Sequence, residues 1–475
     1  MLVLELVSLR LVAPYLGLTL ETSTVVIAVA LTAIATGAAL GGRFADMVPP
    51  ARSLGPLMLV AGGLVLLIVP VVRWTGQALK AEDSGAVILV LALALFAPAA
   101  MLAAVTPMVT KLHLASLNET GTVVGRYSAW GTSGAIAGTV LTGFVFVANR
   151  PTSWILFGLG IVLVVTGAVL TVRLRGWRRA AGPLALALVG SVLTLTAPRF
   201  CQVETAYHCA RVIADPANPN GRSLYLDDLR HSYVDLADPT HLDSEYVKGA
   251  VAAIEAKWPE ASPLRALYIG GGGLTVPRYV EHTRPGSQNK VYEIDRGVVD
   301  LDVNELGAKL GDGLDVRVRD ARLGVRSEPD DSRDLVLGDA FGGRAVPWHL
   351  TTREMVADIH RVLTGEGLYV VNLIDFGSLG FARAEVRTIA DRFRYVAVLS
   401  KPDVLARTGA GGNIVVVASD APLPLDGIGP QLRRLQSPYG MLGTEQEVSN
   451  FIGDAPLLTD DYAPVDQLLT PYGHS

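Results

Sequence analysis

The stretch RALYIGGGG, residues 265–273, predicts the fold of the second half of the chain. Five residues with strand character run directly into four glycines, and a helical pattern follows at 276–281. The same order then repeats, with strands at 291–294, 314–319, 334–337, 367–373, 395–399 and 413–418 and helices at 298–310 and 351–363. Strands that alternate with helices predict a parallel, doubly wound α/β sheet of the Rossmann-like type.

Acidic residues stand at the ends of three successive strands of this predicted sheet. Glu293 closes the second strand, Asp320 follows the third and Asp339 follows the fourth. Because ligands bind at the carboxyl ends of such strands, we expect the three carboxylates to share one crevice. Glu293 is suited to both ribose hydroxyls, and Asp320 to an adenine amino group. The loop is not G-x-G-x-x-G, so we expect an S-adenosyl compound rather than NAD.

A different pattern precedes the glycine loop. Segments 223–227 (SLYLD) and 232–236 (SYVDL) alternate like strands and indicate a hairpin or small sheet. A helix is expected at 244–257, ended by Pro259. The chain is therefore expected to place a small β-segment before its α/β domain.

The first 200 residues have a different composition from the rest. They hold 13 Lys+Arg and 6 Asp+Glu, whereas the remaining 275 hold 27 and 39. Spanning a bilayer takes roughly 20 apolar residues, and long apolar runs lie near 2–20, 25–40, 54–72, 86–105, 129–147, 154–172 and 183–195. We therefore expect a multi-pass α-helical membrane domain of about seven spans, with the lipid bilayer as a partner.

Composition also excludes several classes of protein. The mean hydropathy of +0.38 is too high for a disordered chain or a purely cytosolic enzyme. The soluble half is acidic, so nucleic-acid binding is not expected. The sequence contains no C-x-x-C motif or His-rich cluster, so no metal site is expected either.

Small residues are frequent in the predicted spans. Gly134-x-x-x-Gly138 has the spacing that lets helix backbones approach closely, which predicts packing inside the membrane. Only Glu5 and Arg10 offer ionisable groups for a transport path, and their spacing does not place them on one helix face.

The loop charges bear on orientation. Lys and Arg gather in alternate loops, around Arg43 and Arg52, around Lys111 and Arg126, and at 173–179. If these loops are cytoplasmic, seven spans place the residues after 195 outside. Cys201 and Cys209 are the only cysteines, and the sequence leaves open whether they form a disulfide or remain thiols.

Motifs across most of the chain resemble one family. The stretches SLYLDDLRHSYVDLADPTHLDSEYV, LYIGGGG, VYEID, RDA, LGDAFGG and the closing LTDDYAPVDQL occur in the order found in the polyamine aminopropyltransferases, the spermidine synthases. Together with RLVAPYLG, GGRFAD and GRYSAWGTSGAIAGTVLTGF, they resemble the branch with a fused, transporter-like membrane domain.

The resemblance implies a function and roles for individual residues. It implies transfer of an aminopropyl group from decarboxylated S-adenosylmethionine, a co-substrate, to an amine such as putrescine, with no prosthetic group and with a homodimer. Asp339 would be the catalytic proton acceptor and would also bind substrate with Tyr246 and His231, which replaces a glutamine of the family. The donor would be bound by Gly270, Gly271, Gly272, Glu293, Asp295, Asp320 and Ala321.

Two carboxylates of the family are absent here. The resemblance places an aspartate that holds the donor's amine where this chain has Gly273, and a diamine-binding aspartate where it has Gly342. Asp460, Asp461 and Asp466 are candidates to compensate, although ordinary loop acids are the stronger interpretation.

We therefore predict three domains: transmembrane helices at 1–198, a β-segment at 199–245 and a Rossmann-like domain at 246–475. The predicted enzyme is a membrane-bound transferase whose C-terminal domain is cytoplasmic, where the donor is made, although the loop charges indicate the opposite side. Two alternatives are an S-adenosylmethionine-dependent methyltransferase and a non-catalytic, nucleoside-binding membrane transport or sensor protein.

Overall fold

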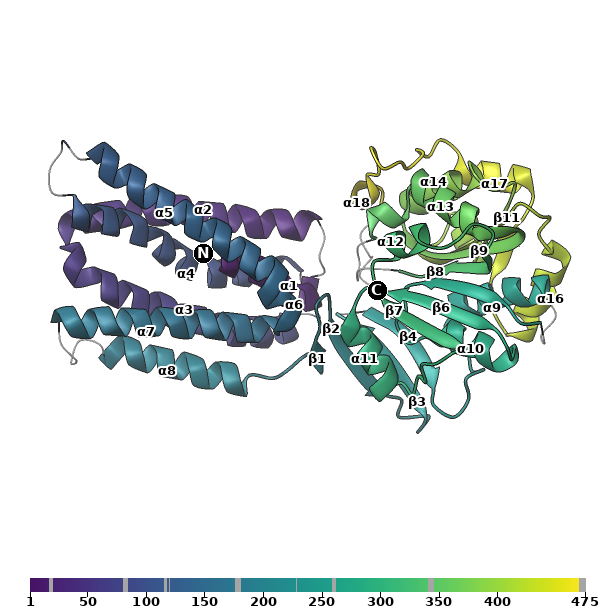
Figure 1. Cartoon of the computed structure of the whole chain (residues 1–475), viewed down its shortest axis with the longest axis horizontal. Coiled ribbons are helices and arrows are strands. Elements are labelled where there is room, and N and C mark those ends of the chain that lie inside the picture. Colours follow the sequence, from purple (N-terminus) through teal and green to yellow (C-terminus); the bar gives the residue numbers. More distant parts are fainter. Residues whose placement is uncertain are drawn as a thin grey trace. The chain divides into compact units, whose positions relative to one another are not determined.

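The structure, a computed structural model, describes residues 1–16, 20–79, 84–114, 118, 120–175, 181–227, 229–258, 262–340 and 346–469. The chain forms two compact units, Met1–Cys209 and Ala210–Ser475, each of which is described by itself (Figure 1).

Unit 1, Met1–Cys209, is helical until a short C-terminal loop. Its elements are α1 (Leu2–Leu16), α2 (Leu20–Met47), α3 (Pro50–Leu79), α4 (Ser84–His113), α5 (Thr120–Leu141), the π-helical turn η2 (Thr142–Phe146), α6 (Val147–Asn149), α7 (Thr152–Arg175) and α8 (Ala181–Thr196). Within the described residues, five segments are long and apolar enough to cross a membrane: Ser23–Met47, Pro50–Gly76, Ala92–His113, Thr120–Asn149 and Thr152–Arg173. The other two predicted spans are helices of only 15 and 16 residues, α1 and α8.

Glycines bring α3 and α7 together. A Cβ atom added at Gly62 would lie 2.9 Å from the carbonyl oxygen of Gly160, and one at Gly167 would lie 2.9 Å from that of Gly55. The two contacts are one heptad apart on each helix, so glycine is required along a shared seam. The predicted role of Gly134 and Gly138 is not found within this unit. A Cβ at Gly134 would meet no described atom within 4 Å, and one at Gly138 only Val3, at 3.3 Å.

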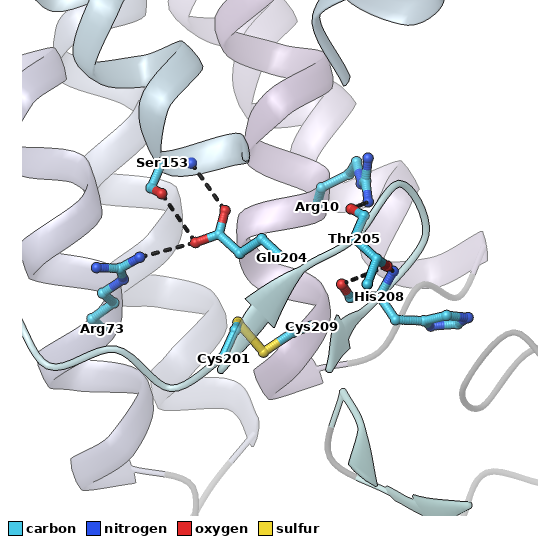
Figure 2. The surroundings of a disulfide bond; sticks show 8 residues. All are labelled: Arg10, Arg73, Ser153, Cys201, Glu204, Thr205, His208 and Cys209. Carbon is cyan, nitrogen blue, oxygen red and sulfur yellow. Dashed lines mark hydrogen bonds and ion pairs between the residues drawn. A yellow bond between two sulfur atoms is a disulfide. The ribbon is translucent and has the colours of Figure 1, made fainter. Parts of the chain in front are cut away.

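A disulfide closes the last loop of unit 1. Cys201 and Cys209 are bonded across eight positions of sequence, which decides the question that the sequence left open. Between them lie β1 (Val203–Glu204) and a turn in which the Thr205 N–H donates to the His208 carbonyl over 2.8 Å. Figure 2 shows Glu204 pointing from this loop toward Arg73 of α3 and Ser153 of α7.

Unit 2, Ala210–Ser475, begins with the small antiparallel sheet that the sequence predicted. Strands β2 (Cys209–Ala214), β3 (Gly221–Leu226) and β4 (Leu229–Asp235) pair in order. Leu224, Leu226 and Val234 of this sheet pack against Val298 and Leu301 of α11 (Arg296–Asn304).

The α/β domain confirms the Rossmann-like prediction, with one correction. Within the described residues the sheet order is β12-β10-β11-β9-β8-β5-β6-β7. The strands are β5 (Arg265–Ile269), β6 (Gln288–Glu293), β7 (Leu314–Val318), β8 (Arg333–Gly338), β9 (Leu363–Phe376), β10 (Tyr395–Ser400), β11 (Gly411–Ser419) and β12 (Gly440–Leu442). Strands β5 to β9 are parallel, as predicted, but β11 pairs antiparallel with β9 and β10, and β12 with β10. The prediction was wrong there because a short connection, 401–410, returns the chain without a crossover helix.

Helices cover both faces of this sheet. Strand β9 shows the arrangement, since Tyr369, Val371 and Leu373 lie in one core and Leu368 and Val370 in the other. The first core also contains α13 (Arg353–Val362), α14 (Gly380–Ala390) and α17 (Glu445–Ile452); the second contains α9 (Glu245–Lys257), α10 (Thr275–Thr283) and α16 (Leu425–Arg434). The domain is completed by α12 (Ala321–Arg326), η4 (Trp348–Leu350), α15 (Pro402–Leu405) and α18 (Val465–Leu468).

The glycine seam of unit 1 yields a prediction. Gly62→Leu should destabilise the chain by about 1–3 kcal/mol, because the larger side chain separates α3 from α7. Gly134→Leu is the matched control, since no described atom lies near that position. Thermal unfolding of both detergent-solubilised variants measures the difference, and an equal midpoint for the two would contradict the seam.

Candidate active site

The candidate site lies where the strand order reverses. Strand β5 is flanked by β6 on one side and β8 on the other, so the loops after β5 and β8 border the crevice that receives ligands in such sheets. Gly270 opens the first loop with φ +96°, and a Cβ there would lie 2.2 Å from the backbone oxygen of Asp339. Glycine is required at this position because it touches the second loop.

Glu293 is held by the backbone of this loop. Its Oε2 accepts from the Gly271 N–H over 2.7 Å, and its Oε1 accepts from the Asp295 N–H over 2.8 Å. The side chain is buried, and each of its oxygens has a backbone N–H donor. The carboxylate therefore lies between the glycine loop and α11, where the sequence placed it.

Two of the predicted donor-binding acids begin helices. Asp295 is fully buried, and its side chain accepts from the Gly297 N–H at the start of α11. Asp320 accepts from the Leu323 N–H at the start of α12, whose first residue is the buried Ala321. The other oxygen of Asp320 lies 3.3 Å from His349 Nε2. Both carboxylates thus stabilise helix N-termini, as acids at this position commonly do.

Asp339 follows β8 and is held from two sides. The Tyr246 hydroxyl donates to Oδ2 and the Asn372 amide donates to Oδ1, both over 2.9 Å. The Asn413 side-chain amide in turn donates to Asn372 Oδ1 over 3.0 Å. His231 contributes its backbone oxygen, which lies 3.4 Å from the Tyr246 hydroxyl. The structure thus brings Asp339, Tyr246 and His231 together.

The surroundings of Asp339 alter its ionisation. Removal from water raises the pKa of the Asp339 carboxyl, and the hydrogen bonds from Asn372 and Tyr246 offset part of that rise. Burial, together with the neighbouring Asp339 carboxylate, raises the pKa of Tyr246 well above its usual range. Asp339 is consequently a stronger base than an exposed aspartate, while Tyr246 remains a hydrogen-bond donor.

The space beside Gly273 is already filled. Gly273 has φ +83°, and a Cβ there would lie 2.0 Å from Ser232 Oγ of β4. Its N–H donates to Asp302 Oδ1 over 2.8 Å. Asp302 is fully buried in α11, and burial raises the pKa of its carboxyl well above the usual range. The fold therefore leaves no room at position 273 for the carboxylate that the family resemblance predicted there. Position 342, the other such position, lies outside the described residues.

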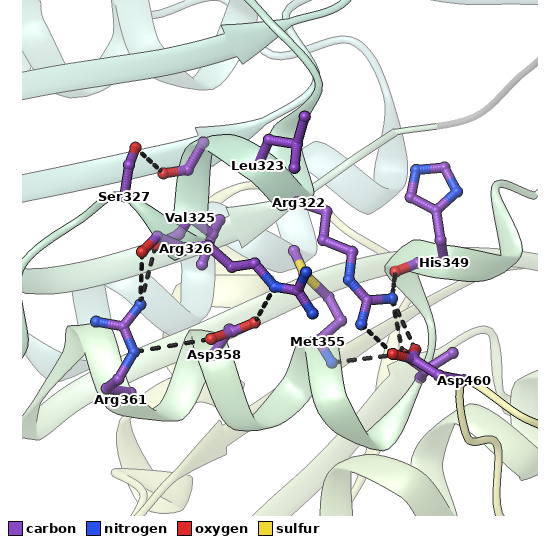
Figure 3. Close-up of polar contacts among 12 residues, drawn as sticks. Arg322, Leu323, Val325, Arg326, Ser327, His349, Met355, Asp358, Arg361 and Asp460 are labelled. Carbon is purple, nitrogen blue, oxygen red and sulfur yellow. Dashed lines mark hydrogen bonds and ion pairs between the residues drawn. The ribbon is translucent and has the colours of Figure 1, made fainter.

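Asp460 forms a structural contact instead of replacing these acids. Arg322 of α12 donates through both terminal nitrogens to the Asp460 carboxylate, at 2.7 and 2.5 Å, and the Thr352 hydroxyl donates to it over 2.7 Å (Figure 3). Its pKa is lowered mainly by the hydrogen bonds from Arg322. These hydrogen bonds hold the C-terminal loop against α12 and the start of α13. Asp460 is thus an ordinary loop acid, which was the stronger interpretation of the sequence.

Four residues of this site were not singled out from the sequence: Ser232, Asp302, Asn372 and Asn413. Asn372 did leave a signal, because an amide inside the apolar strand YVVNLI needs a polar partner. Ser232 and Asp302 left no signal in the sequence, because each is distant in sequence from the glycine loop that it contacts in the fold. In the part of the chain that the structure describes, no group of three His, Cys, Asp or Glu is placed to hold a metal ion.

Comparisons with known proteins find similar chains. No family model matches the chain. The polyamine aminopropyltransferase of Vibrio vulnificus is 26% identical over 218 residues, which are 43% of this chain and 70% of that protein. The crystal structure of a probable spermidine synthase from Corynebacterium glutamicum is 28% identical, covers 55% of this chain and 96% of its own, and superposes with a TM-score of 0.51.

The Ser232–Gly273 contact makes a prediction about stability. Gly273→Ala should cost about 1–3 kcal/mol, because it combines a strained φ with a steric clash. Ser232→Gly in the same chain should recover part of that loss by removing the clash. Gly272→Ala is the control, since a Cβ there would meet only Leu224 at 3.6 Å. Thermal unfolding distinguishes them; equal losses at 272 and 273 would contradict this account.

Proposed function

Because the α/β half of the chain is a homologue of the polyamine aminopropyltransferases, which are transferases, we propose that it transfers an aminopropyl group to an amine. The proposed donor is decarboxylated S-adenosylmethionine, acting as a co-substrate, and the proposed acceptor is an amine such as putrescine. The observation that carries the proposal is the Asp339 carboxylate, held by Tyr246 and Asn372 beside the glycine loop.

The donor would occupy the crevice between the loops after β5, β6 and β7. Glu293 is proposed to bind the ribose hydroxyls, with Asp295 fixing the neighbouring helix. Asp320 and Ala321 are proposed to contact the adenine, which requires that Asp320 exchange its His349 contact for the base. Gly270, Gly271 and Gly272 would allow the ligand to approach the backbone.

Transfer of an aminopropyl group to an amine requires one base. The acceptor amine arrives protonated, and Asp339 takes a proton to free the nitrogen lone pair. That nitrogen attacks the carbon next to the sulfonium, a C–N bond forms, the C–S bond breaks and methylthioadenosine leaves. Tyr246 and the His231 backbone oxygen would orient the amine, and positioning supplies much of the rate of such a displacement.

One observation favours the non-catalytic alternative. Ser232 occupies the space of the carboxylate that would hold the donor's amine. A nucleoside could still bind through Glu293 without any transfer. A methyltransferase on the same fold would also retain the nucleoside contacts, and its product would differ in mass.

We further propose that unit 1 anchors the enzyme in a membrane through its long apolar helices and that the enzyme is a homodimer. The cytoplasmic side is proposed for the α/β unit because the donor is made there. The Cys201–Cys209 disulfide and the loop charges favour the opposite side.

The decisive test is mass spectrometry of the full chain incubated with decarboxylated S-adenosylmethionine and a panel of amines. We expect one amine to gain an aminopropyl group.

Asp339→Asn should slow that transfer by about 10²–10⁴-fold while methylthioadenosine binding stays nearly unchanged, because the base is lost but the nucleoside contacts remain. Nucleoside binding without any transfer would overturn the proposal, and a product heavier by one methyl group would identify a methyltransferase.

The hydrogen bonds to Asp339 predict a pH effect. The bond from Asn372 lowers the pKa of the Asp339 carboxyl, so its loss in Asn372→Ala should raise that pKa. Since the base acts deprotonated, the acid limb of the kcat/KM profile should move to higher pH. Asn450→Ala, at an exposed position of α17, should leave the profile in place. An unchanged acid limb in Asn372→Ala would contradict the claim that the Asn372 hydrogen bond lowers the pKa of the catalytic base.

A further inference from the structure

A cavity of about 120 Å³ opens within unit 1, and none of its described lining residues belongs to the candidate active site. It is lined by Arg73 of α3, the first turns of α7 and the end of α8, and Cys201, Gln202 and Glu204 of the disulfide loop form one wall. Holding one water takes roughly 10–15 Å³, so a group of several heavy atoms fits.

An ion pair between buried Arg73 and partly buried Glu204 lines this cavity. Arg73 is only 8% exposed, and its Nη2 donates to Glu204 Oε1 over 3.0 Å. The hydroxyl and the backbone N–H of Ser153 also donate to the Glu204 carboxylate, over 3.0 and 3.2 Å. Glu204 is therefore fully engaged, whereas a guanidinium has five donors and needs more than one partner.

The charge of the lining is positive. Arg199 is a second guanidinium in the wall; it is exposed and forms no ion pair with any described residue. Glu204 is the only carboxylate among the described lining residues, so two positive charges face one negative charge. A cavity with an unbalanced guanidinium favours an anion with several acceptor oxygens.

The rest of the wall is apolar and aromatic. Trp154, which is 57% exposed, and Phe157 line the cavity from the first turns of α7, and Leu195 lines it from the end of α8. Tryptophan at the end of an apolar helix is typical of the boundary between lipid and water. The same opening thus offers cations for a head group and apolar surface for the chain attached to it.

We propose that this cavity binds the phosphate of an anionic phospholipid head group. Arg199 and the free donors of Arg73 bind the phosphate, Glu204 holds Arg73 in place, and Trp154, Phe157 and Leu195 contact the first part of the acyl chains. The proposal rests on the proposed membrane anchoring of unit 1, and the same phosphate chemistry would also accept soluble phosphate.

Trp154 gives the experiment a readout at the site. The full chain, purified in detergent and depleted of lipid, is titrated with phosphatidylglycerol or phosphatidylcholine carrying the same brominated acyl chains, which quench tryptophan fluorescence on contact. Subtracting the signal of Trp154→Phe isolates the contribution of Trp154.

We expect phosphatidylglycerol to quench Trp154 at a concentration roughly fivefold lower than phosphatidylcholine, the preference that one basic residue provides. Arg199→Gln should remove most of this preference. Arg173→Gln, an exposed arginine near the other end of α7, should keep it. Arg73 is left intact because its removal would leave the partly buried Glu204 carboxylate without its ion-pair partner.

The possible results distinguish a lipid phosphate from a soluble phosphate, and the anion site from membrane anchoring. Inorganic phosphate is added in a further titration. If it relieves the quenching by phosphatidylglycerol and raises the thermal unfolding midpoint only when Arg199 is present, the ligand of this site is a soluble phosphate. Equal quenching of Trp154 by both lipids, unaffected by Arg199→Gln, would overturn the anion site alone. No quenching of any tryptophan by either lipid would refute membrane anchoring and the lipid site with it.

Discussion

The close approach of two backbones at Gly270 is the constraint on which the candidate site depends. With a side chain there, the loop after β5 could not lie against Asp339, and the crevice at the reversal of strand order would open. The same loop gives its Gly271 N–H to Glu293 and its Gly273 N–H to Asp302. One short glycine segment therefore fixes the positions of three acids that come from β6, α11 and the end of β8.

Much of this arrangement follows from local sequence. Alternating strands and helices place Glu293, Asp320 and Asp339 at strand ends before any coordinates are known, because parallel strands end at one edge of the sheet. What each carboxylate contacts does not follow, since it depends on residues distant in sequence: Asp320 caps α12, and Asp339 is held by Asn372. Strands β10 and β11 were predicted, but the antiparallel direction of β11 was not, because pairing direction is decided by the length of the connection rather than by strand composition.

Unit 1 uses two kinds of contact to hold its helices. Along α3 and α7, paired glycines allow the backbones to touch, which needs no polar group. At the end of the same two helices, Glu204 joins Arg73 to Ser153 through a loop tied by a disulfide. A partly buried carboxylate placed this way favours one arrangement of the loop, because another arrangement would leave Arg73 without its ion-pair partner. The sequence analysis pointed to Gly134 and Gly138 instead of the glycines of α3 and α7, and it did not reveal this partnership.

The fit between Ser232 and Gly273 also constrains how the chain can change over time. Ser232 Oγ stands in the volume that any side chain at 273 would enter, so a single substitution cannot place a carboxylate there. A chain that gained one would need a smaller residue at 232 first, or both changes together. The two positions are therefore coupled, and a larger residue at 273 is tolerated only with a matching change at 232.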